Sequence, residues 1–111
     1  MNSYKYGVFA EYVVMTYLML KGYKILKRRY KTKFGEIDIL ATKKKDLIAF
    51  EVKARTKQKL TTEIVSFKQK RRIINALNFF VSKNKKYIDY NIYYNIILYR
   101  NMFNFRIFTE F

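Results

Sequence analysis

Three acidic residues and a lysine form the most informative pattern in the chain. Glu36 and Asp38 stand two positions apart, and Glu51 precedes Lys53 at the same spacing. The chain has only eight acidic residues against 24 Lys and Arg, and four of the eight lie between positions 36 and 51. Residues two apart on a strand point to the same face, so each pair would present its charges together.

The sequence around these residues predicts a β-hairpin. Ile, Leu, Val and Phe dominate both sides of the polar stretch 43–46, which has the length of a turn. Antiparallel pairing about that turn places residues whose numbers sum to about 89 opposite each other. Asp38 would then face Glu51, and Glu36 would face Lys53.

Two acids in this position favour metal chemistry. Like charges that face each other repel, so Asp38 and Glu51 would need a cation, and hard ions such as Mg²⁺ take oxygen ligands of this kind. Lys53 would hold a water molecule or stabilise negative charge that develops on phosphate. A solvated sheet face is the alternative, but the apolar run Leu47–Phe50 indicates a strand covered on both faces.

The composition narrows the possible chemistry and the partner. The chain has neither Cys nor His, which excludes disulfides, thiolate metal sites, cysteine nucleophiles and imidazole bases. Its net charge of +16 favours a polyanion such as nucleic acid. An AT-rich coding sequence would explain the lysines but not the shortage of acids, so we interpret the charge as a basic binding surface.

The length and hydropathy predict one domain over residues 1–111. The N-terminus has no pattern of a secretory signal. The longest apolar stretch, Val8–Leu20, contains an acid and is too short to cross a membrane. We therefore expect a cytoplasmic protein, with attachment to an anionic membrane surface as the weaker alternative.

The predicted fold is α/β, with two helices and five strands in the order αβββαββ. The expected elements are a helix at 6–20, strands at 23–30, 34–42 and 47–55, a helix at 66–82 with Ser66 as its N-cap, and strands at 87–100 and 103–108. The first helix is apolar nearly all the way round, which predicts burial on more than one side. The second helix is expected to bury a stripe made of Phe67, Lys70, Ile74, Leu77 and Val81.

Glu11 interrupts the inward face of the first helix. At helical spacing it shares a stripe with Val8, Met15 and Leu18. We interpret it as a further carboxylate directed at the metal site. The alternative is a partly exposed acid that complements the helix dipole.

Basic residues follow the third strand and begin the second helix. The expected contacts to nucleic acid are Arg55, Lys57, Lys68, Lys70, Arg71 and Arg72. A polar loop at 55–62 beside a helix N-terminus would suit phosphate, whereas a solvated helix face is the alternative.

The arrangement of these residues resembles the PD-(D/E)XK, or restriction-endonuclease-like, nuclease superfamily. Within that superfamily, the segment from about residue 11 to residue 81 resembles the YraN-type family of small bacterial proteins. The motifs that match are Glu11 before Tyr17-Leu18-x-x-x-Gly22-Tyr23-x-Ile25-Leu26, Gly35-Glu36-Ile37-Asp38-Ile39, and Phe50-Glu51-Val52-Lys53-x-Arg55.

The resemblance implies a restriction-endonuclease-like mixed sheet and a DNA endonuclease that uses Mg²⁺ or Mn²⁺. It implies that Asp38, Glu51 and Glu11 are metal ligands, that Lys53 is the catalytic lysine, and that Glu36 is an additional acid. Similarity to archaeal Holliday-junction resolvases implies branched or damaged DNA as the substrate, which would suit a homodimer. A nuclease fold that binds nucleic acid without cleaving it is the alternative.

Two single positions and one stretch depart from the family pattern. Ala10 stands where the family usually has Gly, and Arg29 stands where it often has Asn. The late strand has the stretch 93–96, Tyr-Tyr-Asn-Ile, in place of Arg-Phe-Asp-Val. The loss of that charge pair puts a functional role for the late strand in doubt, while the four expected catalytic residues are intact.

Overall fold

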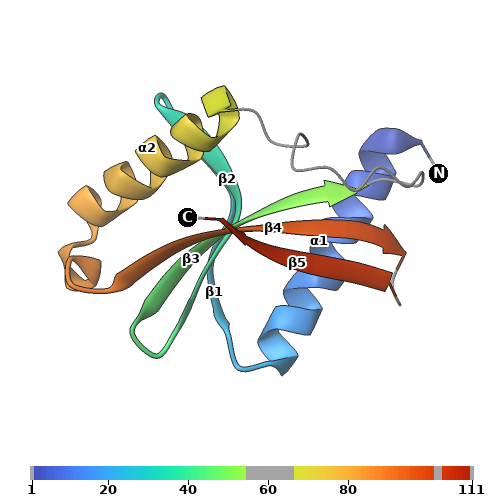
Figure 1. Ribbon diagram of the computed structural model, residues 1–111, viewed down its shortest axis with the longest axis horizontal. Coiled ribbons are helices and arrows are strands. Elements are labelled where there is room, and N and C mark those ends of the chain that lie inside the picture. The colour runs from blue at the N-terminus through green and yellow to red at the C-terminus, as the bar shows by residue number, and fades with distance from the viewer. Residues whose placement is uncertain (1, 55–66, 102–103, 111) are drawn as a thin grey trace.

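A computed structural model describes residues 2–54, 67–101 and 104–110. In chain order, its elements are α1 (Ser3–Leu20), β1 (Lys24–Thr32), β2 (Gly35–Lys43), β3 (Asp46–Ala54), α2 (Phe67–Lys83), the 3₁₀ helix η2 (Lys85–Tyr87), β4 (Asn91–Asn101) and β5 (Asn104–Glu110). The predicted order αβββαββ is confirmed (Figure 1). The fourth strand begins later than expected because η2 precedes it and buries Tyr87 in the core.

The five strands form one mixed sheet in the order β1-β2-β3-β4-β5. The first three strands form an antiparallel meander, β4 lies parallel to β3, and β5 returns antiparallel to β4. A parallel neighbour requires a crossover connection, and α2 lies within the crossover between β3 and β4. The predicted mixed sheet is therefore confirmed.

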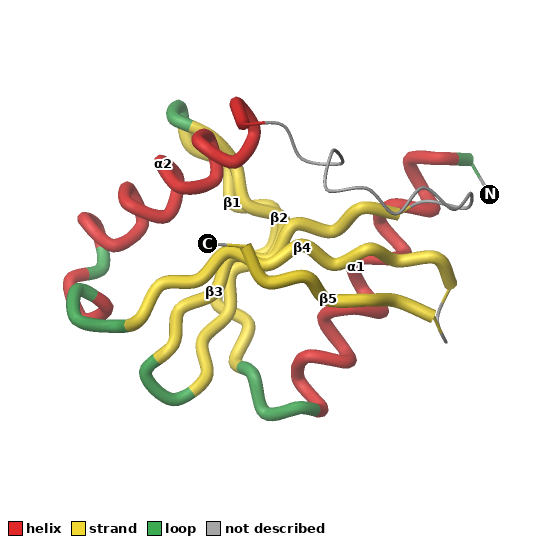
Figure 2. Tube along the Cα trace, in the orientation of Figure 1, coloured by secondary structure: helices red, strands yellow, loops and turns green. Residues whose placement is uncertain are grey.

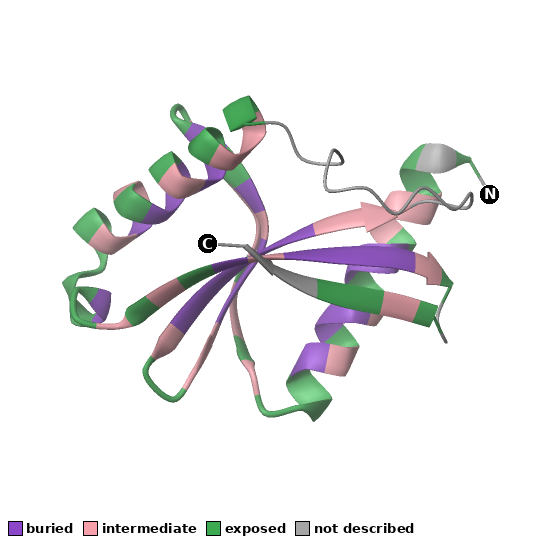
Figure 3. Cartoon of the chain, in the orientation of Figure 1, coloured by how far each residue is buried: buried purple, intermediate pink, exposed green. Residues whose placement is uncertain are grey.

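The two helices pack on opposite faces of the sheet (Figure 1). Leu47 and Ala49 of β3 belong to the cluster under α2, while Ile48 and Phe50 belong to the cluster under α1. Figure 3 shows the resulting buried band along β3 and β4. The prediction of a central strand covered on both faces is confirmed, so a charged residue on β3 lies next to a dry interior.

Helix α1 has clear ends. The side chain of Asn2 accepts a hydrogen bond from the backbone N–H of Lys5 at 2.8 Å, which caps the N-terminus. At the other end Gly22 has a φ of +95°, a conformation that glycine adopts without strain. The predicted end of the first helix at residue 20 is therefore confirmed.

The expectation that α1 is buried on more than one side is wrong. Tyr4, Phe9 and Tyr12 are 67%, 40% and 51% exposed. The buried side consists of one stripe formed by Ala10, Glu11, Val14, Met15 and Leu18. The sheet covers only this stripe, which leaves aromatic rings on the outer surface of the helix.

Helix α2 is rotated relative to the expected stripe. Of the five stripe residues only Leu77 is buried, and Phe67 is 79% exposed. Ile73, Ala76 and Phe80 supply the rest of the buried face. The expected N-cap, Ser66, lies outside the described residues.

A close backbone contact fixes α2 against β2. A Cβ atom placed on Gly35 would lie 2.1 Å from the carbonyl oxygen of Arg72, far inside van der Waals contact. Figure 2 shows the turn between β1 and β2 beside α2. Glycine at this position therefore lets the helix approach the start of β2.

Candidate active site

The predicted hairpin register is confirmed up to the position of the first acid. The pairs of β2 and β3 run from Lys43↔Asp46 to Ile39↔Phe50. At the next position the carboxylate of Asp38 accepts a hydrogen bond from the backbone N–H of Val52, with an N···Oδ2 distance of 2.9 Å. The acid therefore bridges the two strands where the regular pairing ends.

Strand β2 changes the facing of its side chains at this same point. Ile37 and Leu40 pack in the cluster under α2, while Ile39 packs in the cluster under α1. Strict alternation would put Ile37 and Ile39 on one face. On β1, Arg29 has a φ of 53° and lies where the register passes from Arg28↔Ile39 to Tyr30↔Ile37. Asp38 lies at this point of β2, between the two residues whose side chains face opposite sides of the sheet.

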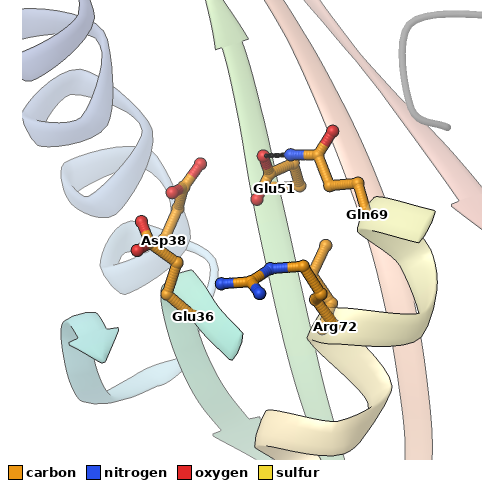
Figure 4. Close-up of a pocket in the computed structure, with 6 residues that line it drawn as sticks. Glu36, Asp38, Glu51, Gln69 and Arg72 are labelled. Atoms are coloured by element: carbon orange, nitrogen blue, oxygen red, sulfur yellow. Dashed lines mark hydrogen bonds between the residues drawn. The ribbon is translucent and has the colours of Figure 1, made fainter. Parts of the chain in front are cut away.

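The acids line a pocket of about 270 Å³ between the sheet and α2. Its lining residues are Glu36, Asp38, Glu51, Gln69, Arg72 and Ile73. Figure 4 shows the guanidinium group of Arg72 extending from α2 toward Glu36 and Asp38. The pocket combines acids from β2 and β3 with polar groups from the first turns of α2.

Glu51 and Lys53 are joined through a glutamine on α2. The Nε2 of Gln69 donates to Oε2 of Glu51 at 2.5 Å, and its Oε1 accepts from Nζ of Lys53 at 3.3 Å. The Lys53 ammonium also lies 3.2 Å from the same Glu51 oxygen. The structure thus brings the predicted Glu51 and Lys53 together, and Gln69 connects both to α2.

Burial controls the ionisation of the two central acids. Burial raises the pKa of the Glu51 carboxyl to about 8, with a further rise from the charge of Asp38 and an opposing effect from Lys53. Burial also raises the pKa of Asp38, against the hydrogen bond from Val52, which lowers it. Two acids this close do not both ionise without compensation. The pair therefore holds a proton near neutral pH or takes up a cation in its place.

Glu11 lies near this pair but belongs to a different set of contacts. Only 8% of the residue is exposed. Its Oε1 accepts a hydrogen bond from Nε of Arg29 at 3.1 Å and lies 3.8 Å from Nη2 of Arg28. Burial raises the pKa of Glu11, with Arg29 opposing and the charge of Asp38 adding to the rise. Glu11 therefore lies within electrostatic reach of Asp38 but is not among the residues that line the pocket.

The predicted basic residues divide into three groups. Arg72 lines the pocket. Lys68 and Arg71 are exposed on the first turns of α2, and Lys70 is half-buried. Arg55 and Lys57, with the expected loop at 55–62, lie outside the described residues.

Oxygen donors dominate the site, which fits a hard cation better than a transition metal. Within residues 2–54, 67–101 and 104–110, no cluster of three or more His, Cys, Asp or Glu has the geometry to hold a metal. Mg²⁺, however, is often bound by one or two carboxylates together with water and substrate phosphate. Asp38 and Glu51 satisfy that smaller requirement.

Gln69 is the site residue that sequence reasoning missed. A glutamine inside a basic run carries no distinctive signal. The expected stripe on the second helix also pointed a different face at the sheet, and the correct rotation would have placed Gln69 and Arg72 together at i and i+3 spacing.

Neither α1 nor α2 could span a membrane, because both are too short or too polar for that role.

Comparisons with known proteins agree with the motifs. The family model described as uncharacterised protein family UPF0102 matches residues 10–101. A UPF0102 protein of Clostridioides difficile (strain 630) is 42% identical over 86 residues, which cover 76% of this chain and 75% of the relative. UPF0102 proteins of Rhodopseudomonas palustris (strain BisA53) and Agrobacterium fabrum (strain C58) are 39% and 41% identical over 86% and 82% of this chain, and 74% and 75% of their own lengths. The chain therefore belongs to UPF0102, the YraN-type family that its motifs predict.

Proposed function

We propose that the protein is a metal-dependent endonuclease that hydrolyses DNA phosphodiester bonds with Mg²⁺ or Mn²⁺. We further propose that it acts in the cytoplasm on branched or damaged DNA. The observation that supports this function best is the pocket in which Asp38 and Glu51 meet beside Lys53.

The two carboxylates fit a divalent cation. Glu51 is buried, Asp38 is half-buried, and both have raised pKa values, so a cation held by them would offset the cost of burying their charges. Bound there, the ion would supply Lewis-acid activation of the phosphodiester and of an attacking water. Asp38 would be a particularly ordered ligand, because its other oxygen is held by the Val52 amide.

The remaining polar groups have distinct roles in this proposal. Lys53 would stabilise negative charge on the phosphate as the bond breaks. Gln69 would hold the side chains of Glu51 and Lys53 in one orientation through its two hydrogen bonds. Arg72 reaches the pocket from α2 (Figure 4) and would bind a phosphate oxygen.

A binding module without turnover is the second candidate function. It is favoured by the contacts of Glu11, whose carboxylate is taken by Arg29 and Arg28. That pairing leaves fewer free acids than the three ligands expected from the sequence. The predicted homodimer is compatible with either function and stays a prediction.

A cleavage assay separates the two functions. Labelled single-stranded, duplex, flap and four-way DNA would be incubated with Mg²⁺ or Mn²⁺, with EDTA as the control. We expect metal-dependent cleavage by the native protein and none by Asp38→Asn. The matched variant Asp89→Asn removes an exposed acid from the segment before β4 and should cleave normally. Normal DNA binding with no cleavage of any substrate would support the binding module instead.

A further inference from the structure

The outer surface of α1 carries two tyrosines whose rings are exposed to solvent. Tyr4 and Tyr12 lie two helical turns apart, and each shows at least half of its surface to solvent. Leaving an aromatic ring in water forgoes the stabilisation that its burial would bring. Exposed rings on the helix that carries Glu11 therefore indicate a binding surface more readily than a packing role.

Each ring is paired with a guanidinium group from β1. The Cζ of Arg28 lies 4.6 Å from the ring centroid of Tyr12, and the Cζ of Arg29 lies 5.4 Å from that of Tyr4. Both distances fall within the range of cation–π contacts. These four side chains lie along the surface where α1 meets β1, with each ring beside its own cation, and we call them the α1 platform.

Glu11 forms ion pairs with both arginines of the platform. Its carboxylate contacts both Arg28 and Arg29 and is buried, whereas the two arginine side chains remain 30% and 32% exposed. An arginine already fixed by a carboxylate and a ring loses less side-chain entropy when it binds a ligand. One carboxylate also neutralises only one of two guanidinium charges, so the platform keeps a net positive charge.

This chemistry suits an unpaired nucleotide. Tyrosine rings and guanidinium planes stack on bases, and the stacking tolerates any sequence because every base has a π face. The surplus positive charge would attract the adjoining phosphate. Bases inside a duplex already stack on their neighbours, so only single-stranded or flipped bases can present a free face.

We propose that the α1 platform, formed by Tyr4, Tyr12, Arg28 and Arg29, binds unpaired nucleotides of nucleic acid by stacking. This extends the proposed function by naming single-stranded segments as the feature that is recognised, and it depends on the nucleic-acid part of that function. In this reading Glu11 is a positioning residue for the two arginines.

Binding measurements without metal test the platform separately from cleavage. Fluorescence anisotropy in EDTA would compare a single-stranded oligonucleotide with a blunt duplex of equal length. We expect Tyr12→Leu to weaken single-strand binding about tenfold, the effect of losing one base stack, and to leave duplex binding nearly unchanged. Tyr12→Phe keeps the ring and should bind like the native protein. Tyr93→Leu makes the same change on β4, which β2 and β3 separate from β1, and should also bind normally.

Several results would overturn the platform. They are equal losses for single strands and duplexes, equal losses in Tyr12→Leu and Tyr12→Phe, or no single-strand binding by the native protein. Flotation with anionic vesicles that depends on Tyr12, without a Tyr12 effect on oligonucleotides, would assign the surface to a membrane instead. Thermal unfolding of each variant identifies any that fails to fold, and Arg28→Lys, which keeps the charge but loses the planar group, then provides the second test. Single-strand binding that depends on Tyr12, without cleavage of any substrate, would contradict the nuclease proposal but support the platform proposal.

Discussion

The carboxylates on the α1 side and on the α2 side of β2 differ in how far nearby cations compensate their charge. On the α1 side, Glu11 is matched by two arginines. On the α2 side, Asp38 and Glu51 lie together in a pocket, and Lys53 is the cation in direct contact with Glu51. Both sides bury negative charge, but among the residues that the structure describes it is the α1 side that offers a surplus of positive charge to offset it.

The proposed function gives these acids different roles, because their charges are compensated to different extents. A carboxylate that already has guanidinium partners gains little from a further cation, because its charge is compensated. A pair of carboxylates that repel each other gains a great deal, since a divalent ion replaces the proton that the pair must otherwise hold. We therefore expect metal affinity to depend on Asp38 and Glu51 far more than on Glu11.

The largest effects are expected from the two central side chains on cleavage. Asp38→Asn should abolish metal-dependent cleavage and lower metal affinity, because it removes a charged ligand. Binding of DNA without metal should hold or tighten, since a negative charge that faces phosphate is gone. Lys53→Ala should instead keep metal binding while cleavage falls by about 10²-fold or more.

Isothermal titration with Mn²⁺ and single-turnover cleavage would measure the two effects separately. Lys24→Ala is the matched control, because it removes an exposed lysine at the start of β1. If Lys53→Ala lost metal binding as completely as Asp38→Asn, Lys53 would act by organising the acids rather than by stabilising charge on the phosphate.

The next effect is on the pH dependence of stability. The pKa of Glu51 is raised from 4.5 to about 8, so the folded state binds more protons than the unfolded state in that window. The free energy of unfolding should therefore fall as pH rises from about 4.5 to about 8, by at most about 1.4 kcal/mol per pH unit. Mg²⁺ or Mn²⁺ should restore stability increasingly as pH rises, because metal competes with the proton.

Glu51→Gln and Glu11→Gln test whether the effect of metal on stability depends on the acid of the α2 side or on the acid of the α1 side. Denaturant titrations from pH 5 to pH 8, with and without metal, would give the slopes. Glu51→Gln should flatten the slope and remove the metal effect, while Glu11→Gln should keep the metal effect. Loss of the metal effect in Glu11→Gln would make Glu11 a ligand, as the sequence predicted.

A smaller loss of stability and of metal affinity is expected when α2 is displaced from its position beside the pocket. Gly35→Ala would place a Cβ 2.1 Å from the Arg72 carbonyl oxygen, so α2 must shift. We expect a loss of about 1–3 kcal/mol in unfolding free energy, as for other overpacked sites, and weaker metal binding as Gln69 moves with the helix. Gly7→Ala is the matched control, because a Cβ there meets nothing within 4 Å and should stabilise α1 by about 0.5–1 kcal/mol. Equal stability of the two variants would show that the contact at Gly35 relaxes freely.

Local pattern was enough to predict the hairpin and its acids. The register of β2 and β3 follows from the turn at 43–46, and the apolar residues of β3 correctly indicated a covered strand. Side chains two apart on that strand share a face, which is why Glu51 and Lys53 meet. Each of these inferences depends on neighbours in the sequence.

The stripe predicted for the second helix was wrong because a tertiary contact overrides local pattern there. The rotation of α2 depends on the backbone contact between Gly35 and Arg72, which no helical stripe encodes. The pairing of Glu11 depends on Arg29, whose φ of 53° is a conformation that Asn adopts more readily than Arg. The sequence flagged this position as a departure from the family, which often has Asn there. In the structure, Arg29 reaches Glu11.

The smallest effect concerns how each side of the molecule would bind nucleic acid. The first turns of α2 carry Lys68, Arg71 and Arg72, and each phosphate contact adds about 0.9 to the steepness of the negative slope of log affinity against log salt. Changing all three to Gln should therefore reduce that slope by about 2–3. Lys24, Lys44 and Lys85 are exposed on other parts of the fold, so the matched triple change to Gln should leave the slope almost unchanged.

The α1 platform should respond differently, because a stacked base displaces few counterions. Tyr12→Leu should lower single-strand affinity while the salt slope stays within about 0.5 of the native value. Anisotropy titrations at several salt concentrations would measure both quantities on the same samples. A slope that falls equally in Tyr12→Leu and in the α2 triple variant would mean that both surfaces bind phosphate alone. A slope that falls only in the α2 variant would assign backbone binding to α2 and base recognition to α1.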